Sequence, residues 1–279
     1  MKLGQKLAVN YIRARLNLLA VLSQKKAAQK AYAIFFTPFY RNKQAPPPIF
    51  SKAEQISIIV KGNTVRGFRW NAGGSKRVLV LHGFESSVKN FDAYITALIN
   101  KNYEVLAFDA PGHGVSGGRQ ITLTLYIDTI AAIHFQVGIV QSFMAHSFGG
   151  LAVTQFIEKI PNQDIRLALI APVTEAVTAI DSFFRFLQLN AGVRSEFEKL
   201  IHIKSGVPAS YFSISRALEN IQGKVLWVHD REDQTTPFRD VEPVMQKNYK
   251  HVSFLVTNGL GHKKIYRDNK VIQAVTDFL

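Results

Sequence analysis

The residues best suited to chemistry lie in the segment Ala145-His146-Ser147-Phe148-Gly149-Gly150, between an expected strand and an expected helix. A small residue stands two positions before Ser147 and a glycine two positions after it, so the chain can turn sharply at the serine. Such a turn lifts the hydroxyl above the sheet at the start of the next helix, where developing negative charge is favoured. The pattern alone is common, but its setting between strand and helix indicates a nucleophilic serine.

A carboxylate that could orient a histidine is expected after the apolar stretch 224–228. The loop that follows holds three acids, Asp230, Glu232 and Asp233. We favour Asp233, because it lies beyond the strand end, four residues before Pro237, where a loop can reach a histidine. Asp230 is closer to the strand and suits a turn or a structural role.

A histidine that could act as base stands in Gly259-Leu260-Gly261-His262, after the last expected strand. A histidine among loop glycines is poorly placed for core packing. The chain order Ser147, Asp233, His262 therefore predicts a catalytic triad with serine as nucleophile, histidine as general base and aspartate as the orienting acid.

An oxyanion hole is predicted beside the serine. Leu81-His82-Gly83-Phe84 ends another apolar strand. The backbone N–H of Phe84 could pair with that of Phe148 to bind a developing oxyanion. The alternative for the His-Gly pair is a plain turn that ends the strand.

The elements that must position these residues alternate between strand and helix from about residue 55. Gly62-Asn63 separates two short β-rich runs and indicates a hairpin. The runs expected as strands are 56–60, 64–70, 77–81, 104–108, 139–145, 165–171, 224–228 and 252–256. Helix-length stretches between most of them predict an α/β fold, a mainly parallel sheet with helices on both faces and right-handed crossovers.

One interval is too long for a single crossover helix. About 50 residues separate the strand that ends near Ala171 from the one that starts at Lys224, and they suit a small helical insertion over the strand ends. Its apolar side chains either bind an acyl chain of the substrate or only attach the insertion to the body. The candidate substrate-binding residues are Phe183, Phe184, Phe186 and Leu187.

A further segment, Phe108-Asp109-Ala110-Pro111-Gly112-His113-Gly114-Val115-Ser116-Gly117, is similar to the D-x-P-G-H-G-x-S loop of a known family. With the triad pattern, it makes residues 55–279 resemble the α/β-hydrolase superfamily, in its serine esterase and lysophospholipase-like branch. The resemblance implies an eight-stranded sheet with a small helical lid after strand six, at about 173–221. Ala145 departs from the family's usual glycine, and the elbow should tolerate this smallest substitute.

The reaction that this machinery predicts is hydrolysis of a small or acyl-chain carboxylic ester through an acyl-enzyme. Thioesterase, acyltransferase and cofactor-free haloperoxidase chemistry use the same triad and stay open, as does a non-catalytic binding module on a hydrolase scaffold. Serine rather than aspartate at position 147 argues against dehalogenase and epoxide hydrolase chemistry. No cofactor or metal is expected, because the chain has no cysteine, no H-E-x-x-H and no G-x-G-x-x-G after a strand.

The net charge of +14 is concentrated at the N-terminus. Residues 1–52 hold ten basic residues and no acid, and they are expected as a basic helical extension with a Pro-rich linker before a hydrolase domain at 53–279. The ten are Lys2, Lys6, Arg13, Arg15, Lys25, Lys26, Lys30, Arg41, Lys43 and Lys52. Polar residues interrupt the apolar ones too often for a signal peptide or a membrane span.

The partners of this extension stay open: the chain's own body, a second copy in a homodimer, or a membrane surface. No motif supports a nucleic-acid partner, so none is expected. The expected location is cytoplasmic, with peripheral membrane contact as an option.

Overall fold

The computed structural model describes residues 3–41 and 44–279, so Lys2 and Lys43 of the basic set lie outside the described residues. The chain divides into two compact units. The α/β unit comprises Pro38–Thr174 and Ile214–Leu279, and the helical unit comprises Met1–Thr37 and Glu175–Ser213. The sequence did not predict that the N-terminal helices and the insertion belong to one unit, and the predicted boundary at residues 52 and 53 stays a prediction.

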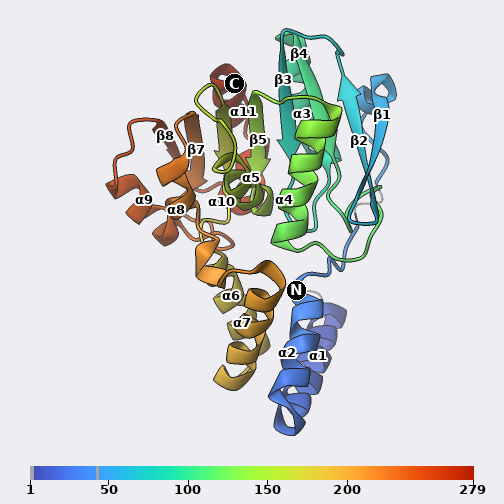
Figure 1. Ribbon diagram of the computed structural model, residues 1–279, viewed down its shortest axis with the longest axis vertical. Helices are drawn as coiled ribbons and strands as arrows, with labels where there is room; N and C mark the ends of the chain where they lie inside the picture. Colours follow the sequence, from blue (N-terminus) through green and yellow to red (C-terminus); the bar gives the residue numbers. More distant parts are fainter. Residues whose placement is uncertain (1–2, 42–43) are drawn as a thin grey trace. The chain divides into compact units, whose positions relative to one another are not determined.

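The α/β unit contains one eight-stranded sheet in the order β1-β2-β4-β3-β5-β6-β7-β8 (Figure 1). Its strands are β1 (Glu54–Val60), β2 (Asn63–Trp70), β3 (Lys76–Leu81), β4 (Tyr103–Phe108), β5 (Ser142–His146), β6 (Arg166–Ile170), β7 (Lys224–Asp230) and β8 (Val252–Thr257). Only the β1–β2 and β2–β4 pairs among these strands are antiparallel. The predicted mainly parallel sheet of eight strands is therefore confirmed.

Most strands start or end one or two residues from their predicted bounds, and the differences at the hairpin turn and at the start of β5 are the informative ones. The hairpin turn is Lys61-Gly62, one residue earlier than predicted, because Asn63 already pairs with Val60. Both turn residues have positive φ, 48° and 77°, as a tight two-residue hairpin requires. Strand β5 starts three residues later than predicted, at Ser142, where pairing with Val78 of β3 begins.

Helices cover both faces of the sheet. They are α3 (Asp92–Asn100), α4 (Leu123–Ala132), α5 (Phe148–Ile157), α8 (Ile214–Ala217), α9 (Glu242–Gln246), α10 (Gly261–Lys264) and α11 (Asn269–Phe278). On one face, apolar residues of α3 and α11 pack on alternate residues of the central strands, such as Val78, Val80 and Met144. Burial on both faces explains why the parallel strands are near-continuous apolar runs.

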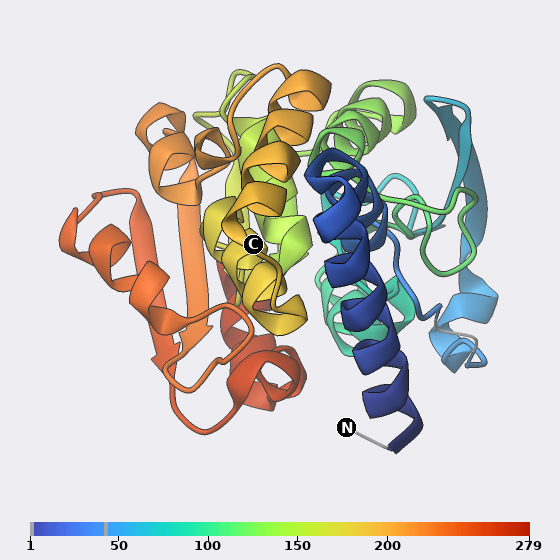
Figure 2. The same cartoon turned by 90° about the horizontal axis from the view of Figure 1, so that it is seen from below.

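The helical unit is built from two distant parts of the chain. Helices α1 (Leu3–Leu22) and α2 (Gln24–Phe35) come from the N-terminal part, and α6 (Ala176–Leu187) and α7 (Ala191–Ser205) follow β6 (Figure 2). Ser23 and Asn190 cap α2 and α7 with side-chain oxygens. Three alanines of α2, all fully buried, allow close packing against the aromatic and branched residues of α6 and α7.

The helical insertion follows β6 in the chain, as predicted, and its position over the strand ends and its role as a lid stay predictions. In the part of the chain that the structure describes, we find no helix long and apolar enough to cross a membrane.

Candidate active site

Ser147 lies in a sharp turn between β5 and α5. Its backbone has φ 55° and ψ −122°, a strained conformation for a residue with a side chain. The turn needs small neighbours, because a Cβ on Gly149 would meet the carbonyl oxygen of His82 at 2.7 Å. Ala145 is fully buried in β5, so the elbow accommodates its methyl group. The hydroxyl therefore stands at the first turn of α5, as the sequence predicted.

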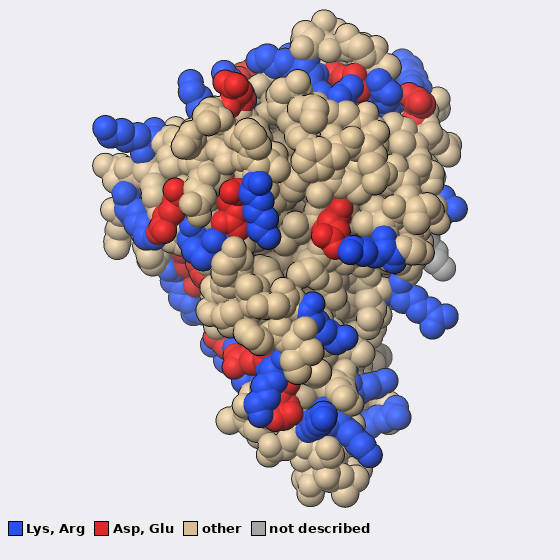
Figure 3. Space-filling view, viewed as in Figure 1, with Lys and Arg blue, Asp and Glu red and all other residues tan. Residues whose placement is uncertain are grey.

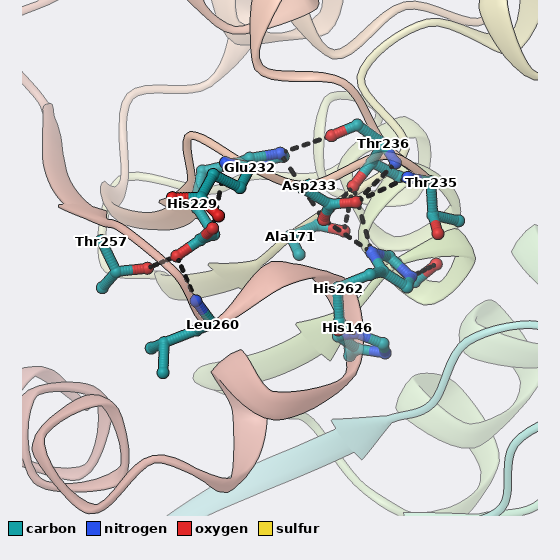
Figure 4. Close-up of polar contacts among 12 residues, drawn as sticks. His146, Ala171, His229, Glu232, Asp233, Thr235, Thr236, Thr257, Leu260 and His262 are labelled. Carbon is teal, nitrogen blue, oxygen red and sulfur yellow. Dashed lines mark hydrogen bonds and ion pairs between the residues drawn. The ribbon is translucent and has the colours of Figure 1, made fainter.

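The three predicted triad residues lie in hydrogen-bonding contact. The Ser147 Oγ is 3.0 Å from Nε2 of His262, and the Nδ1 of the same ring is 2.8 Å from Oδ2 of Asp233 (Figure 4). Ser147 and Asp233 are buried, and His262 is partly exposed at the start of α10. With Nδ1–H donated to the carboxylate, Nε2 is free to accept the serine proton.

The carboxylate of Asp233 is surrounded by donors. Its Oδ1 accepts the backbone N–H groups of Thr235 and Thr236 at 2.8 and 2.9 Å, and its Oδ2 accepts the Thr236 hydroxyl at 2.8 Å. Burial alone would raise the pKa of Asp233, but the hydrogen bonds from His262 and Thr236 outweigh it and hold that pKa below its ordinary value. The group stays ionised, which suits it to steady an imidazolium.

Thr236 is a site residue that the sequence analysis missed. Its hydroxyl also lies 3.2 Å from Nδ1 of His262, so it contacts both partners of the orienting pair. The available indication was its place three residues after Asp233, a spacing at which an acidic side chain often binds the backbone of a turn.

Asp230 has the structural role that was expected of it. Its Oδ2 accepts the hydroxyl of Thr257 at 2.7 Å and the N–H of Leu260 at 3.0 Å. Burial raises the pKa of Asp230, and these hydrogen bonds lower it to a net value below the ordinary one. Because Leu260 lies two residues before His262, Asp230 fixes the loop that carries the histidine.

The predicted oxyanion loop passes close to the nucleophile. A Cβ on Gly83 would meet the Ser147 Cβ at 2.8 Å and its Oγ at 3.2 Å, so only glycine leaves room there. The ring of Phe84 makes an edge contact with the ring of Phe148, with centroids 6.3 Å apart. The two residues therefore lie side by side at the serine, and the use of their N–H groups as oxyanion donors stays a prediction.

Two buried histidines fix this loop. The Nε2 of His82 accepts the N–H of Ala110 at 2.9 Å, and its Nδ1 donates to the Gly83 carbonyl at 2.7 Å. The Nε2 of His113 accepts the N–H of Glu85 at 3.0 Å. Burial, with a smaller contribution from His82, lowers the pKa of His113 to about 3, so it stays a neutral acceptor.

His146, next to the nucleophile, packs against His262, with the two rings tilted by 42°. Its ring centroid lies 4.8 Å from that of His262 and 4.6 Å from that of Tyr266. Burial first, and the neighbouring His262 second, lower its pKa to about 3. His146 therefore supports the His262 ring as a neutral packing partner.

The four candidate substrate-binding residues lie on α6 in the helical unit. Phe184 and Leu187 are buried, and Phe184 packs against Phe197 of α7 with centroids 5.2 Å apart. Phe183 packs against Phe35 of α2, whereas Phe186 is exposed. Their contact with substrate stays a prediction, and at least two of them have a packing role inside their own unit.

No group of three or more His, Cys, Asp or Glu side chains suited to a metal ion is found among residues 3–41 and 44–279.

The fold defines the class of protein, which is an α/β hydrolase. The model of the family described as serine aminopeptidase, S33, matches residues 74–220, more than half of the chain, and the chain belongs to this family. The matched range includes the elbow of Ser147 and the loop at Gly83.

A curated relative is the dihydrolipoyllysine-residue acetyltransferase component of the acetoin cleaving system of Cupriavidus necator, 33% identical over 117 residues. The match covers 41% of this chain, which spans only about a third (31%) of that relative's length. Among solved structures, an esterase of Pyrococcus furiosus has 18% identity and a TM-score of 0.65, covering 87% of this chain and 95% of its own. A bacterial membrane phospholipase A has 16% identity and a TM-score of 0.62, covering 96% and 97%. At these identities the structures show the fold alone.

Proposed function

We propose that the chain hydrolyses carboxylic esters through an acyl-enzyme, with Ser147 as nucleophile, His262 as general base and Asp233 as the orienting acid. The observation that carries the proposal is the continuous chain of contacts from the Ser147 Oγ through the His262 ring to the Asp233 carboxylate, at 3.0 and 2.8 Å. Each distance is within the range for proton transfer or hydrogen bonding.

The proposed first half-reaction forms the acyl-enzyme. The Ser147 oxygen attacks the carbonyl carbon of the ester while its proton moves to Nε2 of His262. The resulting oxyanion accepts the N–H groups of Phe84 and Phe148, at the loop beside the serine and at the start of α5. As the carbon–oxygen bond to the alcohol breaks, His262 returns the proton to the leaving oxygen.

In the second half-reaction, a water molecule enters after the alcohol has left and attacks the acyl-enzyme. His262 accepts a proton from the water as its oxygen attacks the acyl carbon, and then gives a proton to Ser147 Oγ as the acid leaves. The Asp233 carboxylate stays ionised throughout, since hydrogen bonds keep its pKa low. It holds Nδ1–H in place and stabilises the imidazolium at both stages.

Ester substrates are favoured by two lines of support. The family belongs to the α/β hydrolases, and an esterase and a phospholipase share the fold. The family's description names an aminopeptidase, so amide hydrolysis is the competing substrate class to test.

The test is covalent labelling by a fluorophosphonate, which reacts with an activated serine. We expect labelling of the wild type and none of Ser147→Ala. We expect His262→Ala to label at least about a hundredfold more slowly, because the hydroxyl loses its base. Ser253→Ala, which changes an exposed serine of β8, is the matched control and should label like the wild type.

Circular dichroism would establish that each variant is folded. Folded wild type that does not label, or Ser147→Ala that labels normally, would overturn the proposal. Turnover of p-nitrophenyl esters of increasing chain length against aminoacyl p-nitroanilides then separates ester from amide hydrolysis. Faster turnover of the anilides would contradict the ester assignment while retaining the triad.

A further inference from the structure

Helix α1 is apolar on two opposite faces. The inner face carries Leu16 and Ala20, which are buried inside the helical unit. Leu18 and Leu22 lie about half a turn away and are exposed to 67% and 78%. A helix on the surface of a unit ordinarily presents polar residues on its outer side, so the outer face of α1 needs another explanation.

The outer apolar residues form a continuous stripe. Leu7, Tyr11, Leu18 and Leu22 are spaced by four, seven and four residues, which places them on one side of a helix, and Val21 lies beside them. Their exposed fractions run from 62% to 84%. We call these five residues the outer stripe.

Exposed cations flank the outer stripe, and they have no acidic neighbours in the sequence. Lys6 and Arg15 on α1 and Lys25 and Lys26 at the start of α2 are exposed. The first acidic residue of the chain is Glu54. Figure 3 shows Lys and Arg side chains over the helical unit, some beside Asp and Glu side chains, together with broad uncharged areas at its end.

We propose that the outer stripe docks on an anionic lipid surface, with its apolar side chains in the interface and the flanking cations on lipid phosphates. An apolar stripe bordered by Lys and Arg on one helix is the arrangement that binds in the plane of such a surface. The positive charge of the flanking Lys and Arg residues favours an anionic lipid surface over a second copy of the chain. Two copies of α1 in contact along their stripes would bring like charges together, and α1 itself carries no acid to offset them.

The docking is independent of the proposed hydrolysis, because no residue of the outer stripe belongs to the triad or its loops. It gives the N-terminal helices a second task besides packing against α6 and α7. Arg13 is not counted among the lipid-binding cations, because its guanidinium donates a hydrogen bond to the carbonyl oxygen of Phe186 on α6 at 2.6 Å.

The test is co-sedimentation of the full chain with vesicles. We expect binding to vesicles that contain phosphatidylglycerol and much weaker binding to pure phosphatidylcholine. The double variant Leu18→Ser with Leu22→Ser should bind at least about a hundredfold more weakly, since each leucine contributes roughly a factor of ten or more. Lys25→Gln with Lys26→Gln should bind about 25-fold more weakly to the anionic vesicles, at roughly fivefold per cation.

Matched controls test whether the loss of binding is specific to the outer stripe and its flanking cations, or follows from removing any exposed apolar residue or cation. Ile203→Ser removes an exposed apolar residue from α7 of the same unit, and Lys76→Gln with Lys224→Gln removes two exposed cations from the α/β unit. Both controls should bind like the wild type. Circular dichroism would verify that the variants keep their helices.

Three results would overturn the proposal. The first is no binding of folded wild type to either vesicle. The second is an equal loss in the stripe variants and the controls. The third is a concentration-dependent dimer, seen by analytical ultracentrifugation without lipid, that the leucine variant abolishes; a second copy would then be the occupant.

Discussion

The α/β unit and the helical unit bury different kinds of side chain. Among the described residues, Ser213 is the one buried polar residue of the helical unit, whereas the α/β unit buries about twenty, including Asp109, Asp233 and three of the site's histidines. Buried polar groups are stable only with partners at defined distances, so they fix loops in one geometry. An apolar core is held by shape and area alone. Substitutions among the buried polar groups of the α/β unit should therefore change the catalytic rate. Substitutions in the apolar core of the helical unit should change the free energy of unfolding.

The largest expected effect is on chemistry. Asp233→Asn should lower kcat for a p-nitrophenyl ester by about 10⁴-fold, because the amide no longer holds the required tautomer of His262. Exposed Asp164→Asn is the matched control and should leave kcat unchanged. A loss below about tenfold for Asp233→Asn would mean that another group orients the histidine.

The next effect is on stability of the helical unit. Phe197 is fully buried and its ring contacts those of Tyr32, Phe35 and Phe184. Phe197→Ala should lower the free energy of unfolding by about 3–5 kcal/mol through lost burial and a cavity. Denaturant unfolding measures this.

The control for that variant lies on the same helix. Exposed Ile203→Ala should change the free energy of unfolding by no more than about 0.5 kcal/mol. If Phe197→Ala were equally mild, the helical core would not contribute to the measured stability.

A smaller effect on chemistry is expected at the oxyanion loop. The methyl group of Gly83→Ala would press on Ser147, at 2.8 Å from its Cβ, and displace either the serine or the loop. We expect kcat to fall about a hundredfold with little change in KM, because the lost contacts belong to the transition state. Gly4→Ala, in open space on α1, should leave kcat unchanged. An unaffected Gly83→Ala would contradict the predicted role of this loop.

The most gradual effect concerns pH. Burial lowers the pKa of His113 from 6.5 to about 3, so below pH 6.5 the unfolded chain binds a proton there that the folded chain does not. The free energy of unfolding should therefore fall as the pH decreases from 6.5 towards 3, by about 1.4 kcal/mol per pH unit from this residue.

The variant His113→Gln keeps an acceptor but cannot titrate. Its free energy of unfolding should fall less steeply in this window, and above pH 7 the two proteins should respond to pH in parallel. Denaturant unfolding at a series of pH values measures both slopes. Equal slopes below pH 6.5 would show that His113 does not resist protonation.

The sequence was sufficient for the sheet and the triad contacts because both depend on local patterns. Apolar runs of strand length mark the sheet, and Ser147, Asp233 and His262 each follow one of its strands, whose carboxyl ends meet at one edge. Distance from the strand end also favoured Asp233 over Asp230 as the acid that contacts the histidine. Their catalytic use still rests on the experiments above.

The contacts that the sequence did not reveal depend on side-chain geometry or on distant chain segments. The hydroxyl of Thr236 reaches the triad only because the turn after Asp233 folds back on the carboxylate. The partnership of α1 and α2 with α6 and α7 could not be predicted, because an amphipathic pattern shows that a face is buried but not what covers it.

The divided origin of the helical unit has a consequence for biosynthesis. The 137 residues Pro38–Thr174 separate its two chain segments. At about 5–20 residues per second, synthesis of these 137 residues takes roughly 7–27 seconds, during which α1 and α2 exist without α6 and α7. During that time, the part of the helical core that α2 shares with α7 has no covering helix, and chaperones or a lipid surface could occupy it. Nascent chains arrested before residue 175 should accordingly be cut in α1 and α2 by proteases that spare these helices in the finished protein.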